Sequence, residues 1–428
     1  MKNSKKVTFV LMFLLLSVGM LWARGKGEAA AVEQKPVTLK VLRMGTQEIW
    51  VSFVRDFITR FEKRNPNVTV DYEYCPEPDL PKKFTTAIAG GTIPDVVGGS
   101  IKYVAMYAAK GLYMPLDDYF NSWDAFDDVA KNMLKVSYYD GKHYALAYHP
   151  DPYVYAYRKD YFGEAGLDPK NRPDTWAKLA EWASKLTKRD GDIVTRSGYL
   201  MPIDDNLTFI PMAVMNGAQF LDENKQPTFN GPEWIEALEF MTNLRKKNIS
   251  TDTRMQQEWG SSTFAKGNAA IAQVSSAMLA QFFDAYPAKK DEVAYFQLHK
   301  DEKTTKTSNW NGAWLYSIPS GSKNIDLAWK FIEEWMSPEE VWACYAATQN
   351  VPVLNSLRDK FTDVNPELNA ALFKGVETGL GNPLVTWATQ QIVMIRKAMG
   401  ESYYGEKKPA QALQDNYKLL LDEIKKAQ

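Results

Sequence analysis

Apolar residues follow two different spacings in the first quarter of the chain. Every second position is apolar in segments 37–41 and 68–74, which is typical of strands, and segment 95–97 is a short apolar run. Between them, apolar residues recur every three or four positions in 51–64 and 80–88, which predicts helices. The order strand, helix, strand, helix, strand predicts an α/β fold, with parallel strands and helices on both faces of the sheet.

Helical spacing predominates after residue 170. Prolines at the first turns and apolar stripes mark four helices, and three segments read as strands. The predicted helices lie near 175–186, 232–247, 328–336 and 409–427, and the predicted strands at 269–274, 293–298 and 313–318.

The segment 144–161 combines six tyrosines with a histidine and Asp151. Tyr153, Tyr155 and Tyr157 share one face of a predicted strand, where they could hold a sugar or simply pack, because aromatic residues favour strands. Asp151 stands between two prolines, so its backbone lacks neighbouring donors and a protruding carboxylate is expected.

The N-terminus resembles a secretory signal. Three lysines precede the apolar run 7–22 and Ala23 follows it, so we expect residues 1–23 to be a signal peptide, with a flexible segment at 24–35. Cleavage near 29–31 and an uncleaved anchor are the alternatives. No cysteine lies near the cleavage region, so lipid attachment is unsupported, and we expect a periplasmic or secreted protein.

The remaining chain is globular and mildly acidic. Removing the three lysines of residues 1–23 from the 51 basic side chains leaves 48 against 52 acidic ones, a formal charge of −4, which argues against nucleic acid as a partner. About 400 residues are too many for one core, so two lobes are expected. Cys75 and Cys344, the only cysteines, could form a disulfide or be two buried thiols.

Several separated motifs occur in a specific order. They include GTIPDVV at 91–97, GLYMPLDDYF at 111–120, PDTWAKLAEWASKLT at 173–187 and FAKGNAAIAQ at 264–273. Together with 140–168, 216–248, 312–341 and NVPV at 350–353, they resemble the extracellular solute-binding proteins of family 1, the maltose-binding-protein-like carbohydrate receptors of ATP-driven importers.

This resemblance implies a two-lobed α/β fold of type II, with a hinge between the lobes and a mixed, mostly parallel sheet flanked by helices in each. The first lobe would comprise 36–147 and 303–345, and the second 148–302 and 346–428. The crossings would lie near Ala147, near Asp301 and beyond Ala346.

The same resemblance implies a receptor without catalysis, cofactor or metal. The lobes would close on a sugar or oligosaccharide in the cleft between them, and the closed form would dock on the membrane permease of an ABC importer. A monomer is expected.

Sugars offer apolar faces and hydroxyl groups, so a sugar site needs aromatic rings beside orientable polar groups. Trp50, Trp310 and Trp387 lie in or beside loops with polar neighbours, among them Asn311, and could line the cleft or anchor their loops. By contrast, tryptophans on helix stripes are expected in cores, and Trp314 in strand packing.

The polar candidates follow strands or the first crossing. Asp151 matches a position from which members of the family offer an acidic group to the sugar. The loops after the first and third strands contribute Gln47, Glu48 and Ser100, because ligands bind at the carboxyl ends of strands. Glu48 could instead stabilise the start of a helix. The remaining candidates are Tyr148 and Tyr153.

Other functions are less well supported by the sequence. A glycosidase needs two carboxylates at a fixed separation, and no local context marks such a pair. The three histidines show no metal-ligand spacing. A polyamine would favour acids among rings, and Asp151 and Glu48 among rings leave this alternative open. An anionic ester would favour several basic residues, yet the candidate loops have only Lys102 and Arg158 nearby, so a neutral sugar is preferred.

Overall fold

The computed structural model describes residues 35–427 except 248, 252–262 and 305. The predicted signal peptide, 1–23, and nearly all of segment 24–35 lie outside the described residues.

Residues 37–158 contain the predicted alternation of strands and helices, followed by short helices and one long strand. The elements are β1 (Val37–Met44), α2 (Glu48–Arg64), β2 (Val68–Cys75), α3 (Leu80–Ala89), β3 (Val96–Ser100), α4 (Val104–Ala109), α5 (Asp117–Asn121), α6 (Lys131–Lys135), β4 (Tyr138–Tyr139), β5 (Lys142–His143) and β6 (Leu146–Arg158).

Helices predominate in the rest of the chain. The elements up to residue 296 are α7 (Lys159–Glu164), α8 (Trp176–Leu186), β7 (Lys188–Asp190), β8 (Ile193–Tyr199), α9 (Asn206–Met215), α10 (Pro232–Lys246), β9 (Ala269–Ser275), α12 (Ser276–Ala285) and β10 (Val293–Phe296). Those after it are β11 (Asn311–Ser317), α13 (Ile325–Trp335), α14 (Pro338–Thr348), α15 (Arg358–Val364), α16 (Pro366–Thr378), α17 (Ala388–Tyr403) and α18 (Pro409–Ala427).

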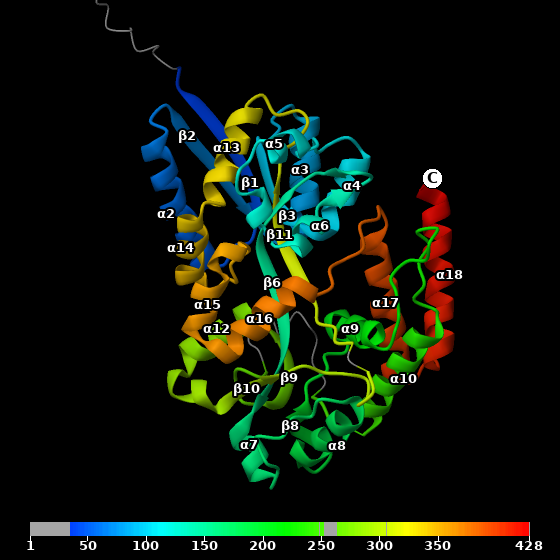
Figure 1. The fold of residues 1–428 in the computed structure, drawn as a ribbon. Coiled ribbons are helices and arrows are strands. Elements are labelled where there is room, and N and C mark those ends of the chain that lie inside the picture. Colours follow the sequence, from blue (N-terminus) through cyan, green and yellow to red (C-terminus); the bar gives the residue numbers. More distant parts are fainter. Residues whose placement is uncertain (1–34, 248, 252–262, 305, 428) are drawn as a thin grey trace, which may run out of the picture.

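Two lobes share the long strand β6 (Figure 1). In the first lobe the strand order is β2-β1-β3-β11-β6, and in the second lobe β9 and β10 flank β6, with β8 and β7 beyond β9. Residues 146–152 of β6 pair with β11, whereas Tyr153 pairs with Ser275 of β9. The partner of β6 therefore changes between Pro152 and Tyr153, and this strand passes from one lobe to the other.

The α/β fold with two lobes is confirmed, but parallel pairs are fewer than predicted. In the first lobe β1 is parallel to β2 and β3, whereas β11 is antiparallel to β3 and β6. Among the described strands of the second lobe, β8 and β9 form a parallel pair, and the other pairs are antiparallel. The reason is connectivity, since β6 leads into the second lobe and β11 returns, and a short turn joins β7 to β8.

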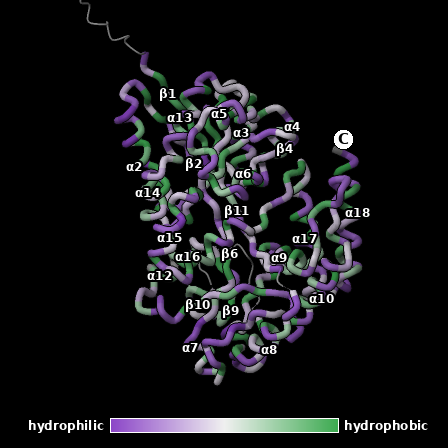
Figure 2. Tube along the Cα trace, in the orientation of Figure 1, coloured by the Kyte–Doolittle hydropathy of each residue, from purple (hydrophilic) through white to green (hydrophobic). Residues whose placement is uncertain are grey.

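Amphipathic helices close the core of each lobe. In the first lobe, Phe57 of α2 packs edge-on against Phe331 and Trp335 of α13, with ring centroids 5.2 and 4.7 Å apart. In the second lobe, Tyr155 and Tyr157 are buried in the core. Figure 2 shows hydrophilic and hydrophobic residues alternating along the peripheral helix α18, as expected for a helix with one buried face.

Cys75 and Cys344 are buried free thiols, so the predicted alternative of a disulfide is not realised. Burial raises the pKa of Cys75 to about 11 and that of Cys344 to about 12. In the part of the chain that the structure describes, no helix has both the length and the apolar character needed to cross a membrane.

Candidate ligand-binding site

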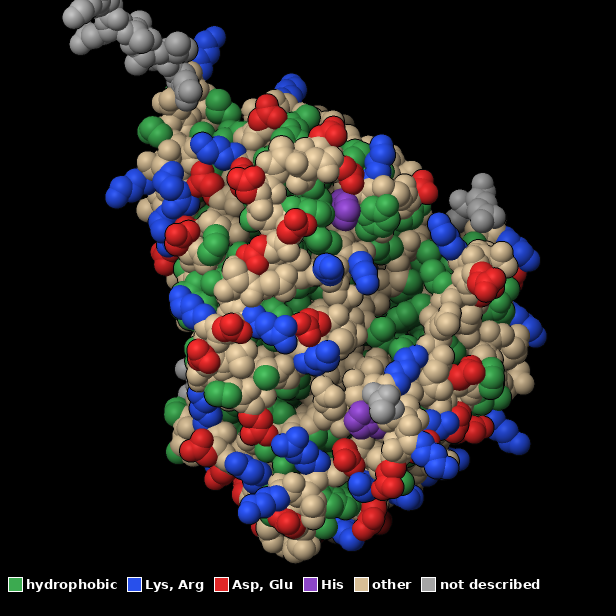
Figure 3. Space-filling model, in the orientation of Figure 1, with side chains coloured by type: hydrophobic (Ala, Val, Ile, Leu, Met, Phe, Trp, Pro, Cys, Tyr) green, Lys and Arg blue, Asp and Glu red, His purple; other side chains and the backbone are tan. Residues whose placement is uncertain are grey.

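Two cavities lie where β6 and β11 run between the lobes, and the space-filling view shows the molecule hollowed between its upper and lower parts (Figure 3). The first compartment has a volume of about 350 Å³ and the second about 420 Å³. Both are lined by Gln47, Asp151, Tyr153 and Trp314. Because they share these walls, we treat them as two compartments of one cleft.

Three rings form one wall of the first compartment. His149 of β6 stacks on Trp50 of α2, with centroids 4.4 Å apart and planes at 24°, and Trp314 of β11 lies 4.8 Å from the imidazole. The register of the sheet sets this contact, since His149 and Trp314 are direct cross-strand partners. Gly45 leaves room for the Trp314 ring, because a Cβ at this position would lie 3.0 Å from the ring. The φ of Gly45, +101°, also favours glycine.

Arg43 of β1 lies beneath this wall and is fully buried. Its guanidinium is 4.7 Å from the Trp314 ring centroid and 5.1 Å from that of Trp50, and its Nε donates to the Tyr148 hydroxyl at 2.9 Å. Burial and the nearby Arg43 charge hold the pKa of His149 well below its usual range. The ring wall is therefore neutral at physiological pH.

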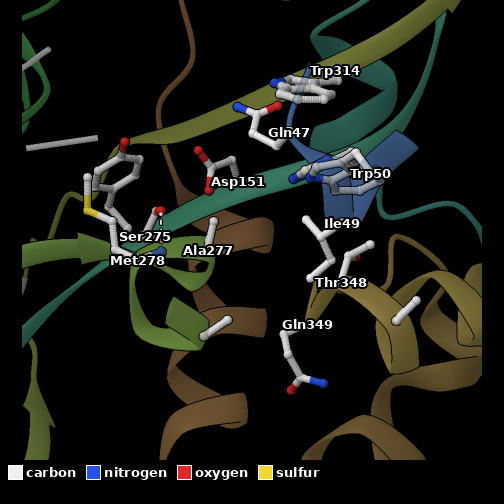
Figure 4. A pocket seen from close by; sticks show the side chains of 14 residues that line it. Gln47, Ile49, Trp50, Asp151, Ser275, Ala277, Met278, Trp314, Thr348 and Gln349 are labelled. Carbon is white, nitrogen blue, oxygen red and sulfur yellow. Dashed lines mark hydrogen bonds between the residues drawn. The ribbon is translucent and has the colours of Figure 1, made fainter. Parts of the chain in front are cut away.

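Asp151 lies at the junction of the two compartments. Figure 4 shows its side chain between the ring wall and Ser275 of the second lobe. Among the described residues, its buried Oδ1 has no hydrogen-bond partner. Burial raises the pKa of this carboxyl to about 7, against a smaller lowering by its hydrogen bond with Ser275. A buried oxygen without a partner beside a cavity is a ready acceptor for a ligand hydroxyl group.

Uncharged polar groups from three helix ends complete the first compartment. Gln47 precedes α2, and its side chain makes no capping bond to that helix. Ser275 caps α12, and Thr348 and Gln349 end α14, where Gln349 has a left-handed backbone. These side chains offer both donors and acceptors from several directions.

The second compartment is more strongly charged. On the side of the first lobe, Lys102 pairs with Glu77 at 2.5 Å. On the side of the second lobe, Arg396 of α17 donates from Nε to Asn206 Oδ1 at 2.7 Å. Trp310 is also part of the lining.

The structure brings six of the ten predicted site residues together along the cleft: Gln47, Trp50, Ser100, Asp151, Tyr153 and Trp310. The other four line neither compartment. Tyr148 is buried, bonded to Arg43 and stacked on Tyr316 with centroids 4.2 Å apart. Asn311 is fully buried, with Nδ2 3.4 Å from the Val376 carbonyl oxygen.

Glu48 and Trp387 also lie away from the two compartments. Glu48 is exposed in the first turn of α2, where its negative charge interacts favourably with the helix dipole. This matches the alternative prediction that Glu48 stabilises the start of a helix. Trp387 precedes α17 and packs partly buried against the core of the second lobe.

Sequence reasoning missed several lining residues and misplaced one basic residue. Trp314 was expected in strand packing, although it follows Trp310 and Gly312 at a period of two and so shares their face. Arg396 and Ser275 gave no local signal, because only the fold places them at the cleft. Arg158, by contrast, is buried in the second lobe, bonded to Asp160 and Glu292.

Comparisons with known proteins identify the family of this chain. Residues 46–342 match the family model described as bacterial extracellular solute-binding protein. A mannitol-binding protein of Pseudomonas aeruginosa is 26% identical over 322 residues, which is 73% of this chain and 70% of that protein. The sn-glycerol-3-phosphate-binding periplasmic protein UgpB of Shigella dysenteriae is 25% identical over 391 residues, 83% of this chain and 85% of that protein.

A solved structure shares the fold. The sugar-binding protein MalE of Xanthomonas citri superposes with a TM-score of 0.80, at 21% identity, over 91% of this chain and 98% of that one. At this level of identity the likeness supports the fold alone.

Proposed function

Because this chain belongs to the family of bacterial extracellular solute-binding proteins, we propose that it captures a saccharide in the cleft between its lobes and delivers it to the permease of an ABC importer. The observation that carries the proposal is the pairing of the ring wall, formed by Trp50, His149 and Trp314, with the unpartnered Asp151 oxygen.

The chemistry of the first compartment fits a sugar. The flat indoles can receive the apolar face of a pyranose, and Asp151, Gln47 and Ser275 can bond its hydroxyl groups. The mannitol-binding relative supports a polyhydroxylated solute. A site that combines aromatic rings with hydrogen-bonding partners for the hydroxyl groups binds a carbohydrate more specifically than a site with only one of these features.

Capture would proceed by hinge closure. We assign 36–147 and 303–345 to the first lobe and 148–302 and 346–428 to the second, with hinges near Ala147, near Asp301 and beyond Ala346. Gln47 and Trp50 would then belong to one lobe and Ser275 and Met278 to the other. Closing the lobes would surround the solute and exclude water, which strengthens each hydrogen bond to it.

The proposed setting is the periplasm or the extracellular space, after removal of residues 1–23, with the protein acting as a monomer. The sequence pattern 1–23 and the periplasmic UgpB relative support this setting. No chemistry on the solute is proposed. The compartments offer the carboxyl groups of Asp151 and Glu77, and Glu77 is paired with Lys102, whereas a glycosidase needs an acid and a second carboxylate across one bond.

A melting-temperature screen tests this function. The protein without residues 1–23 is heated with mono- and oligosaccharides, sugar alcohols, polyamines and phosphate esters. A ligand at 100 times its dissociation constant stabilises the folded state by about 2.7 kcal/mol, which raises the melting temperature measurably. A rise with saccharides, which chromatography shows to be recovered unchanged, is expected. Shifts with polyamines alone, or cleavage of the saccharide, would overturn the proposal.

A further inference from the structure

Asp151 is the one acid in the described lining of the first compartment, and this lining has no lysine or arginine. His149 is held neutral, and burial raises the pKa of Tyr153 well above its usual range, so neither is charged near neutral pH. The other polar groups of the lining are neutral amides and hydroxyl groups, from Gln47, Ser275, Thr348 and Gln349. When Asp151 is ionised, the first compartment therefore has a negative charge.

This charge has no counterpart in the described part of the chain. Oδ1 of Asp151 is buried and has no hydrogen-bond partner there. A lysine or arginine beside the carboxyl would lower its pKa, but among the described residues the one lowering influence is the hydrogen bond with Ser275. Arg43 lies behind the ring wall, against the indoles, and donates to Tyr148.

The second compartment, which Asp151 also borders, does not supply the missing charge. Its lining includes Lys102 and Arg396. Lys102 is paired with Glu77 at 2.5 Å, and neither Lys102 nor Arg396 lowers the pKa of Asp151. A cation that pairs with Asp151 would therefore come from the solute.

The energetics of burial favour such a solute. An ionised carboxylate that is shielded from water without an opposite charge is costly, and the proposed closure of the lobes would shield Asp151 further. A sugar hydroxyl group can donate a hydrogen bond to the unpartnered Oδ1, but a protonated amine donates a hydrogen bond and also balances the charge. The complement of this carboxylate is an ammonium group.

One such carboxylate suits one ammonium group rather than the several of a polyamine. Two further acids near the second compartment are already engaged. Glu77 is paired with Lys102, and the Asp205 carboxylate accepts hydrogen bonds from the backbone amides of Leu207 and Thr208 at the start of α9. A second ammonium group of the solute would therefore lack a partner of this kind.

Resting on the function proposed above, we propose that the solute is an amino saccharide whose protonated amino group pairs with Asp151. Its amino-bearing ring lies against Trp50 and Trp314, and the ammonium group donates to Oδ1 of Asp151. Gln47, which lines the same compartment (Figure 4), offers its side-chain carbonyl oxygen as a second acceptor. The first compartment, about 350 Å³, is within the range of small-molecule sites, about 300–1,000 Å³, and the second leaves room for a further unit.

Matched sets of ligands test the charge requirement. Titration calorimetry at pH 7 compares glucosamine, galactosamine, mannosamine and the disaccharide of glucosamine, each with two uncharged counterparts. One counterpart is the N-acetylated saccharide, and the other has a hydroxyl group in place of the amine. We expect at least one amino saccharide to bind about tenfold or more tightly than both of its counterparts, because a hydrogen bond between charged groups is stronger than one to a neutral donor. Spermidine, measured alongside, should bind more weakly.

Asp151→Asn should abolish the preference, so that the amino saccharide binds no more tightly than its hydroxyl counterpart. The matched control is Glu48→Gln, which removes the same charge from an exposed position next to Gln47 that lines neither compartment, and it should keep the preference. Melting curves without ligand show that each variant is folded.

Equal or tighter binding of the uncharged counterparts would overturn the amino saccharide and leave the receptor function standing. A preference that survives in Asp151→Asn, or that is lost equally in Glu48→Gln, would also overturn it, as would tighter binding of spermidine than of every amino saccharide. Absence of binding by every saccharide in these sets and in the melting screen would reject the receptor function as well.

Discussion

His149 stacks on Trp50, with ring centroids 4.4 Å apart and planes 24° from parallel, although the two residues come from different elements and lie 99 positions apart in the sequence. Trp314 adds the third ring at 5.4 Å from Trp50. In this wall each ring contacts the other two, and the buried Arg43 lies against the two indoles.

Trp50→Ala should weaken saccharide binding about tenfold or more. It removes a stacking surface and frees His149 to reorient, and aromatic contacts contribute about 0.5–1.5 kcal/mol beyond the area that they bury. Calorimetry with a saccharide found in the melting screen measures the change. Trp387→Ala is the control, because Trp387 lines neither compartment. A wild-type affinity in Trp50→Ala would contradict the ring wall as a sugar platform.

Truncating Asp151 should cost about 2 kcal/mol or more of binding free energy, because a carboxylate accepts charge-assisted hydrogen bonds from sugar hydroxyl groups. Asp151→Ala is compared with Asp151→Asn, which keeps one acceptor oxygen and should lose less. Affinities from calorimetry at pH 8, above the raised pKa of Asp151, give the comparison. Similar affinities for all three proteins would show that Asp151 does not contact the solute.

Asp151 should also make the ligand-free protein less stable as pH rises from about 4 to about 7. Its pKa is raised from 3.8 to about 7 by burial, so in this window the folded state retains a proton that the unfolded state has lost. Stability then falls with pH, by at most about 1.4 kcal/mol per pH unit for one group.

Urea unfolding of the wild type and Asp151→Asn across this pH range checks the sign. The stability of the variant relative to the wild type should grow with pH and level off above pH 7. Asp205, whose pKa burial raises to about 6, contributes a slope of the same sign in both proteins, so only the difference between them reports on Asp151. Parallel curves would contradict the assignment.

Gly45→Ala should lower stability by more than Gly91→Ala does. Both glycines have positive φ, +101° and +67°, but a Cβ at Gly91 meets no atom within 4 Å, whereas at Gly45 it would press on the Trp314 ring at 3.0 Å. We expect a loss of about 1 kcal/mol at Gly91 and about 2 kcal/mol or more at Gly45 from denaturant unfolding. Equal losses would mean that the ring moves aside freely.

The two cysteines should react as free thiols only after unfolding. Both are buried, with raised pKa values of about 11 for Cys75 and about 12 for Cys344, so little thiolate forms at pH 8. Titration with a thiol reagent, without reductant, should find two thiols per chain in guanidinium chloride and almost none in the native protein. A count of zero in the unfolded chain would instead reveal a disulfide.

Local patterns in the sequence predicted the elements and the part of the site that belongs to the crossing strand. The last helix was predicted over its observed range, because Pro409 marks its first turn and its apolar residues keep one spacing. Asp151 and Tyr153 could be predicted as site residues because they belong to the unusual tyrosine-rich segment 144–161. The sequence did not reveal which distant segments pack together at the cleft.

Arg396, for example, lies 294 positions after Lys102, and only packing of the second lobe brings α17 to the cleft. Likewise, Tyr148 was predicted at the site as part of the leading end of the tyrosine-rich segment, yet successive strand residues point to opposite faces, and Tyr148 faces the buried Arg43. The alternation of side chains along β6 was therefore predicted correctly for the tyrosines after Pro152, but the same alternation was not applied to Tyr148.

Under the proposed hinge closure, the continuous strand β6 would place the solute beside a segment that connects the two lobes. Because one strand is hydrogen-bonded into both sheets, the proposed rotation of the lobes would be taken up partly as twist of β6 near Pro152, next to Asp151. Ile49 and Val393, by contrast, are exposed lining residues of the cleft, so closure would change their surroundings. The proposed closure would therefore act in two steps: the solute would first contact Asp151 in the open cleft, and the exposed lining residues would then close over it and slow its release.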